Sequence, residues 1–113
     1  MRDARRPPVN PRLKDPHADR LCQGVLALRS VDECYRFFED VCTVGEFKAM
    51  AQRFEIARLL YTGHTYEDIV RLTRASSATI SRVRRFLEYG ADGYRLVLQR
   101  LGVRPRPGAA AQA

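Results

Sequence analysis

The stretch "ASSATISRVRRFL", residues 75–87, places small residues, apolar residues and three arginines within little more than three helical turns. It follows a helical pattern at 66–73 after a connection of about three residues, 74–76, which is the spacing of a helix-turn-helix. Such a unit needs apolar or small residues on the facing sides of both helices. The expected core residues are Ile69, Leu72, Ala75, Ile80, Val83 and Leu87.

The outer face of the second helix, predicted over 77–89, has a different composition. At 100° per residue, the side chains that point away from Ile80 and Val83 are Ala78, Ser81, Arg82 and Arg85. Small residues let a helix enter the major groove of DNA, and arginines bind phosphates or guanine edges. The alternative is that these arginines only form a solvated surface.

The distribution of charge favours the first interpretation. The chain of 113 residues has a formal net charge of +7, and residues 71–113 carry nine arginines but only two acidic residues. Residues 21–70 carry five basic and eight acidic residues. Solubility alone can explain a net charge of this size. A basic block on a candidate recognition helix, however, is typical of a protein that binds a polyanion.

Helix-start signals recur along the chain. "SVDE" (30–33) and "TVGE" (43–46) match the capping box, "TYED" (65–68) is a weaker version, and Ser76 is a further N-cap candidate. They predict an all-α fold without strands. The six expected helices are 18–28, 31–42, 44–61, 66–73, 77–89 and 91–101.

The sequence divides into three parts. Residues 1–17 are rich in proline and charge and predict a flexible basic arm, residues 18–102 predict one helical domain with the helix-turn-helix at about 66–89, and residues 103–113 predict a disordered tail. Helix 31–42 is apolar over nearly half its circumference, and the 56–61 end of the long helix is apolar all round. A second subunit is a natural source of cover, so we expect a homodimer rather than a monomeric bundle.

Several classes of protein are disfavoured. There is no apolar run long enough to span a membrane and no secretory signal, so we expect a cytoplasmic protein. Cys22, Cys34 and Cys42 form no CxxC pair and are expected to be buried thiols. His17 and His64 are isolated, and no nucleophile motif or phosphate loop is present. We therefore expect no metal, no cofactor and no enzymatic activity.

Three stretches carry a resemblance to a known family. "TVGEFKAMAQRFEIARLLYTG" (43–63), "TYEDIVRLTRASSATISR" (65–82) and "FLEYGADGYRLVLQRL" (86–101) resemble the Trp-repressor superfamily, and within it the YerC/YecD-type Trp-repressor-like proteins of bacteria. The resemblance implies a six-helix, interlocked homodimer that presents two helix-turn-helix heads to a palindromic operator. It also implies a role as a transcriptional regulator, with repression the first expectation.

The resemblance also implies an effector pocket. The family's tryptophan lies between two arginines, which match Arg53 and Arg82 here, but Phe86 and Val83 replace a polar and a small residue of that pocket. These departures argue against tryptophan as the corepressor. The ring of Phe86 would fill the space of the indole and stack on Arg82 or Arg53; ordinary core packing of Phe86, with a pocket left open or taking another small-molecule effector, is the alternative.

The resemblance assigns residues to the DNA as well. The base-approaching positions are Ser77, Ala78, Thr79 and Ser81. Glu67 and Val70 replace phosphate-contacting residues, so the phosphate contacts fall to Arg71, Arg74, Arg84 and Arg85. Arg74 also stands where many helix-turn-helix proteins have a glycine with positive φ. The competing hypothesis is a helical interaction module that binds transcription machinery and uses DNA only as a non-specific anchor.

Overall fold

The structure, a computed structural model, describes residues 6–107 and contains no strand in that range. Its elements in chain order are η1 (Pro11–Leu13), α1 (Pro16–Leu26), α2 (Val31–Val41), α3 (Val44–Tyr61), α4 (Tyr66–Thr73), α5 (Ser77–Tyr89) and α6 (Gly93–Arg100). The predicted all-α fold of six helices is confirmed, with the short 3-10 helix η1 in addition. No helix of the described residues is long and apolar enough to cross a membrane.

The start of α1 differs from the prediction by two residues. The side chain of Asp15 accepts a hydrogen bond from Ala18 N at 2.7 Å, and Pro16 occupies the first helical position, where its fixed φ suits a helix. Upstream, Asn10 caps η1 in the same way, accepting from Arg12 N at 3.0 Å. The segment expected to be a flexible arm therefore contains helical turns from residue 11 onward, and residues 1–5 lie outside the described range.

Two of the predicted capping boxes form, at α3 and α4, and the one at α2 is shifted by one residue. Thr43 and Glu46 exchange two hydrogen bonds of 3.1 and 2.8 Å at the start of α3, and Thr65 and Asp68 do the same at the start of α4. At α2 the Ser30 hydroxyl accepts from Glu33 N, while the Glu33 carboxylate accepts from Arg29 N, one residue before the N-cap. These reciprocal bonds satisfy backbone donors that a helix start leaves unpaired.

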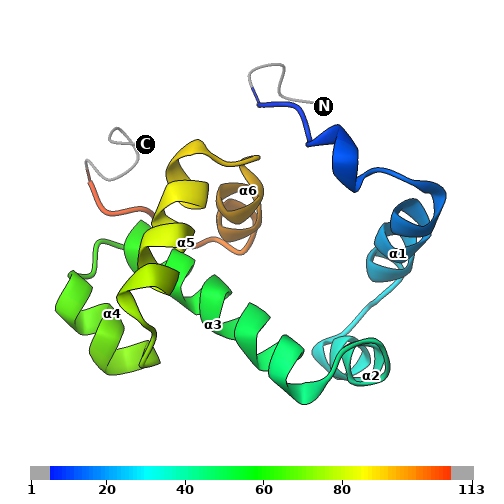
Figure 1. Cartoon of the computed structure of the whole chain (residues 1–113), viewed down its shortest axis with the longest axis horizontal. Coiled ribbons are helices and arrows are strands. Elements are labelled where there is room, and N and C mark those ends of the chain that lie inside the picture. Colours follow the sequence, from blue (N-terminus) through cyan, green and yellow to red (C-terminus); the bar gives the residue numbers. More distant parts are fainter. Residues whose placement is uncertain (1–5, 108–113) are drawn as a thin grey trace. The chain divides into compact units, whose positions relative to one another are not determined.

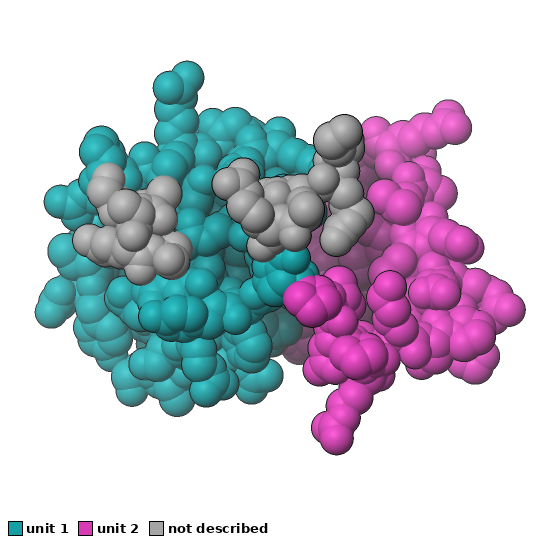
Figure 2. Space-filling model, turned by 90° about the horizontal axis from the view of Figure 1, so that it is seen from above, with its two compact units in different colours: residues 1–7, 50–113 teal, residues 8–49 magenta. Residues whose placement is uncertain are grey.

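The chain divides into two compact units (Figure 2). Unit 2 comprises Pro8–Ala49, and unit 1 comprises Arg6, Pro7 and the described residues from Met50 onward. Helix α3 contributes residues to both.

The core lies in unit 1, where α4, α5 and α6 surround the C-terminal part of α3 (Figure 1). One cluster joins α3, α4 and α5 and consists of Ile56, Ala57, Leu59, Ile69, Ala75, Ile80 and Val83. A second joins α3, α5 and α6 through Tyr61, Leu87 and Leu98. The all-round apolar end of α3, which the sequence assigned to a dimer contact, is thus covered by helices of the same chain.

Leu72 was predicted as core and is not. Its side chain is 52% exposed, whereas Ile69 on the same helix is fully buried. Thr73 is half-buried, and it lies 40° from Ile69 on the side away from Leu72. The buried face of α4 is therefore centred between Ile69 and Thr73, which turns Leu72 toward solvent.

Unit 2 has no fully buried residue. Its aromatic side chains pack on one another, with 5.7 Å between the ring centroids of Phe38 and Phe47 and 5.8 Å between those of Tyr35 and Phe47. The prediction of buried cysteines was wrong for the chain taken by itself, because Cys22 is exposed and Cys34 and Cys42 are only half-buried. The physical reason is that two short helices cannot enclose a core of their own.

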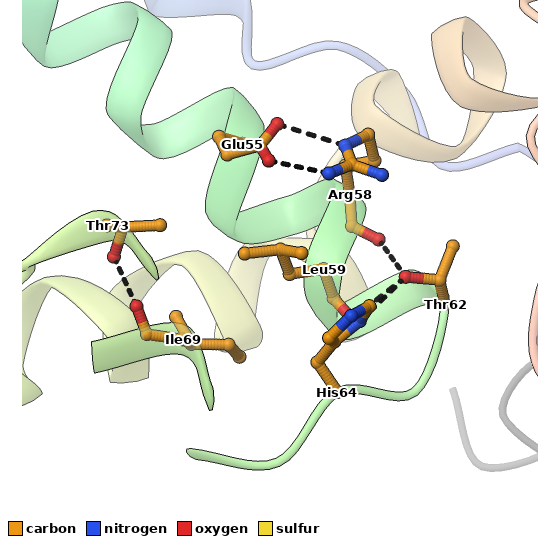
Figure 3. A network of polar contacts seen from close by, with 7 residues as sticks. All are labelled: Glu55, Arg58, Leu59, Thr62, His64, Ile69 and Thr73. Carbon is orange, nitrogen blue, oxygen red and sulfur yellow. Dashed lines mark hydrogen bonds and ion pairs between the residues drawn. The ribbon is translucent and has the colours of Figure 1, made fainter. Parts of the chain in front are cut away.

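A polar network ends α3 (Figure 3). Glu55 accepts two hydrogen bonds from the Arg58 guanidinium, at 2.9 and 2.6 Å, and this contact holds the pKa of Glu55 below its ordinary value. The hydroxyl of Thr62 donates to Arg58 O at 2.9 Å, and the His64 ring lies 3.1 Å from the same hydroxyl. These contacts give hydrogen-bond partners to the Arg58 carbonyl and the Thr62 hydroxyl at the C-terminal end of α3.

The first residues of the predicted tail are ordered against unit 1. Arg106 N donates to Tyr61 O and the Arg106 guanidinium donates to Gly63 O, both at 3.2 Å. Val103 packs on the second core cluster. Arg106 therefore satisfies two carbonyls at and just after the end of α3, and Val103 N donates to Leu98 O in α6. Residues 108–113 of the predicted tail lie outside the described range.

The turn between α4 and α5 contains the predicted left-handed residue. Arg74 has φ 57° and ψ 24° and ends α4 by donating its backbone N–H to Val70 O at 2.8 Å. A residue with a Cβ in this conformation costs about 1–2 kcal/mol.

Replacing Arg74 by Gly tests this geometry. The change removes the left-handed cost and restores about 0.4–1 kcal/mol of unfolded-chain entropy, so we expect a net gain of up to about 1 kcal/mol in the free energy of unfolding. Arg84→Gly is the matched control, because it removes the same charge inside α5 and should cost about 1 kcal/mol. Urea unfolding without DNA measures both; equal destabilisation by the two variants would contradict the strained turn.

Candidate nucleic-acid interface

Helix α5 is fixed by its N-cap and its inner face. The Ser76 hydroxyl oxygen accepts from Thr79 N at 3.2 Å and lies 3.1 Å from the Thr79 hydroxyl. Ile80, Val83 and Leu87 are buried in unit 1, as predicted. Because three buried residues on one face define the rotation of a helix about its axis, the opposite face of α5 is determined as well.

That opposite face is presented to solvent. The predicted DNA-contacting residues of α5 that are exposed are Ser77, Ala78, Ser81, Arg82, Arg84 and Arg85. Thr79 differs from them, since it is half-buried and its hydroxyl already has Ser76 as a partner. Residues 77–81 of α5 therefore offer a surface of small and polar side chains, and residues 82–85 offer three guanidinium groups.

The two predicted arginines of α4 and the turn are both exposed, but only one has an acidic partner among the described residues. Arg71 lies 3.0 Å from a carboxylate oxygen of Asp68. This hydrogen bond is the main cause that lowers the pKa of Asp68, and the backbone N–H of Thr65 adds to it. Arg71 is thus partly neutralised, whereas Arg74 and the α5 arginines form none of the salt bridges between described residues.

Phe86 stacks with arginines, as the sequence predicted for Arg82. The guanidinium carbon of Arg82 lies 5.8 Å from the centroid of the Phe86 ring, and that of Arg85 lies 5.4 Å from it. Phe86 is 45% exposed, so it is not ordinary core packing within this chain. An open hollow of about 300 Å³ adjoins the ring and is lined by Phe86, Ala91, Gly93 and Tyr94.

The second arginine of the implied effector pocket, Arg53, makes no cation–π contact with Phe86 among the described residues. Arg53 is half-buried on α3, and the recorded ring contacts of Phe86 are with Arg82 and Arg85 but not with Arg53. Within one chain the structure therefore brings Arg82 and Phe86 into contact.

The sequence did not predict the contacts of two arginines, Arg95 and Arg6, near the end of α5. Arg95 donates to Leu87 O at 3.0 Å and lies over the Tyr61 ring at 5.9 Å, which ties α6 to the end of α5. Arg6 pairs with Asp92 at 3.0 Å at the turn between α5 and α6. Neither contact follows from a short spacing in the sequence. Arg6 and Asp92 are 86 positions apart, and Arg95 and Leu87 are 8 positions apart.

Comparison with known proteins agrees with this geometry. The family model of the Trp repressor protein matches residues 16–102. The chain is 48% identical over 90 residues to the uncharacterized protein YerC of Bacillus subtilis (strain 168), covering 80% of this chain and 86% of that protein.

Solved structures give the same result. A TrpR-like protein from Eubacterium eligens superposes with a TM-score of 0.81 at 49% identity, covering 86% of this chain and all of that one. A candidate Trp repressor from Staphylococcus aureus superposes with a TM-score of 0.80 at 39% identity, covering 84% and 95% of the two chains. The chain therefore belongs to the Trp repressor protein family.

Proposed function

We propose that this protein is a sequence-specific DNA-binding regulator of transcription, acting as a repressor in the cytoplasm without a catalytic role. The observation that carries the proposal is the exposed surface of α5. Its outer face presents Ala78, Ser81, Arg82 and Arg85, and Ser77 and Arg84 are exposed beside that face. Small side chains allow close approach to base edges, and the arginines reach the phosphates beside them. Membership of the Trp repressor family supports this assignment.

Selection of bound fragments from random DNA at physiological salt tests the proposal. A regulator prefers its operator over random DNA by about 10³-fold or more. Binding that depends on salt but shows no preferred sequence would instead support an interaction module anchored on DNA. We expect the selected sequence to be palindromic, because a two-fold symmetric dimer reads two equivalent half-sites.

The proposal includes a homodimer, and unit 2 supplies the observation for it. Leu26, Tyr35 and Val44 are 84%, 60% and 77% exposed, although unit 2 has no buried residue to stabilise its helices. A hollow of about 220 Å³ between α2 and the start of α3 is lined mainly by Tyr35, Phe38, Cys42, Val44 and Phe47. Apolar surface of this extent on a small helical protein indicates an interface with another chain.

Light scattering at micromolar concentration should give about twice the chain mass of 12.9 kDa. Tyr35→Asp places a charge in the unit 2 apolar surface and should shift the mass toward the monomer, because an unpaired charge is costly to bury. Tyr89→Asp is the matched control, since Tyr89 is also exposed, at 78%, but lies at the end of α5. A wild-type monomer at these concentrations would refute the dimer.

Arg85 should govern how tightly DNA is bound rather than which sequence is bound. Arg85→Ala is expected to weaken all sites roughly equally and to reduce the salt slope of binding by about one unit, because phosphate contacts position without specifying. Ser81→Ala should alter the preferred sequence. A change of preference by Arg85→Ala with an unchanged slope would place Arg85 among the base-reading residues instead.

Asp68→Asn is expected to change DNA affinity in the opposite direction to Arg85→Ala. The asparagine retains an oxygen that can accept from Thr65 N–H, but it releases Arg71 from its ion pair. We expect tighter binding and a steeper salt slope, since one more guanidinium becomes available to a phosphate. Unchanged binding would show that Arg71 does not face the DNA.

Tryptophan is not the corepressor in this proposal. The Phe86 ring already stacks on Arg82, and a ligand shifts an equilibrium only by its differential affinity for two states. The apo-protein should bind its operator with no more than about a twofold change on adding millimolar L-tryptophan, and Phe86→Ser should bind more weakly. A tenfold tightening of wild-type binding by tryptophan, about 1.4 kcal/mol, would refute this.

A further inference from the structure

The turn between α4 and α5 is held by three local hydrogen bonds. The Thr73 hydroxyl donates to Ile69 O at 2.7 Å (Figure 3) and accepts from Ala75 N at 3.2 Å. Arg74 N donates to Val70 O at 2.8 Å. These bonds are local, so they determine the shape of the turn but not its position against the rest of unit 1.

One further bond comes from a distant helix. The side-chain amide of Gln52 on α3 donates from Nε2 to Thr73 O at 3.1 Å, across 21 positions of sequence. Among the hydrogen bonds between described residues, it is the one that joins α3 to the helix-turn-helix. The other contacts between them are apolar: the cluster around Ile56 and Leu59, and the packing of Tyr61 on Leu87 in the second cluster.

The two kinds of contact have different consequences. Apolar burial is non-directional, so the two clusters hold the helices together but leave the angle between them a scatter of about 15–20°. A hydrogen bond has a preferred distance and direction. The bond to Thr73 O therefore selects one position of the turn along α3.

The bond also acts at the point where the backbone changes direction. Thr73 O and Arg74 N belong to the same planar peptide group, and both are held, one by Gln52 and the other by Val70 O. Arg74, directly after this peptide, is the left-handed residue from which the chain enters α5. A change in the plane of this peptide would therefore rotate α5 relative to α3.

We propose that Gln52 is a positioning residue for DNA recognition, which sets the angle of α5 on α3 and thereby the spacing between the two half-sites that the dimer reads. The inference rests on the proposed function. In a two-fold symmetric dimer each change of angle occurs twice, and the distance between reading helices must match the helical repeat of DNA. Gln52 itself does not contact the DNA in this role.

The test compares operators that differ only in spacing. Affinity is measured for the selected operator and for versions with one base pair added or removed between the half-sites, using wild type, Gln52→Met and Gln99→Met. Methionine keeps the length and helix propensity of glutamine but cannot donate to Thr73 O. Gln99 is an exposed glutamine on α6 whose side chain takes part in none of the hydrogen bonds recorded for residues 6–107, so it is the matched control.

We expect wild type and Gln99→Met to lose about tenfold or more in affinity on altered spacing, and Gln52→Met to lose no more than about threefold. Thermal melting monitors the fold of each variant. If Gln52→Met does not fold, Gln52→Ala, which removes the same donor without filling the space, is measured against the same criterion.

The outcomes separate the two proposals. A wild-type protein that selects an operator, with a Gln52 variant that keeps full discrimination of spacing or loses affinity equally for all spacings, would overturn the positioning role alone. A wild-type protein without any preferred sequence would overturn the proposed function and the positioning role together.

Discussion

Burial of the C-terminal end of α3 is the interaction on which the rest of unit 1 depends. Ile56 is fully buried among residues of α4 and α5, and each such aliphatic side chain contributes about 1.5–3 kcal/mol. The same contact gives the reading helix its rotation, because the inner residues Ile80 and Val83 enter this cluster. The exposed face of α5 is thus a consequence of where its apolar face is buried.

Polar interactions determine the conformation of the turn between α4 and α5 and the charge of the surface beside it. Arg74 accepts a left-handed conformation in a turn where Thr73 and Val70 satisfy the neighbouring polar groups, so three residues suffice to join two helices. Charge is divided over the same surface, with Arg71 paired to Asp68 and the α5 arginines outside any salt bridge recorded for residues 6–107. In the proposed function, the unpaired guanidinium groups are the ones that meet phosphates.

The helices of unit 2, unlike those of unit 1, do not enclose a buried core. Its helices are well capped and aromatic, yet none of its residues is fully buried. Local signals therefore establish its helices, but nothing within the 42 residues 8–49 encloses their apolar side chains. The homodimer of the proposed function would supply that cover.

The sequence by itself determined the six helices, the N-caps of α2 to α5 and the inner face of α5, because capping and helical periodicity act within a few residues. The left-handed turn at Arg74 was also expected, because Arg74 stands where many helix-turn-helix proteins have a glycine with positive φ. Tertiary structure alone decided that Leu72 is exposed, that α3 is covered by its own chain, and that Gln52 reaches Thr73. These depend on which faces meet in space, and a contact between residues 21 positions apart leaves no periodic trace in the sequence.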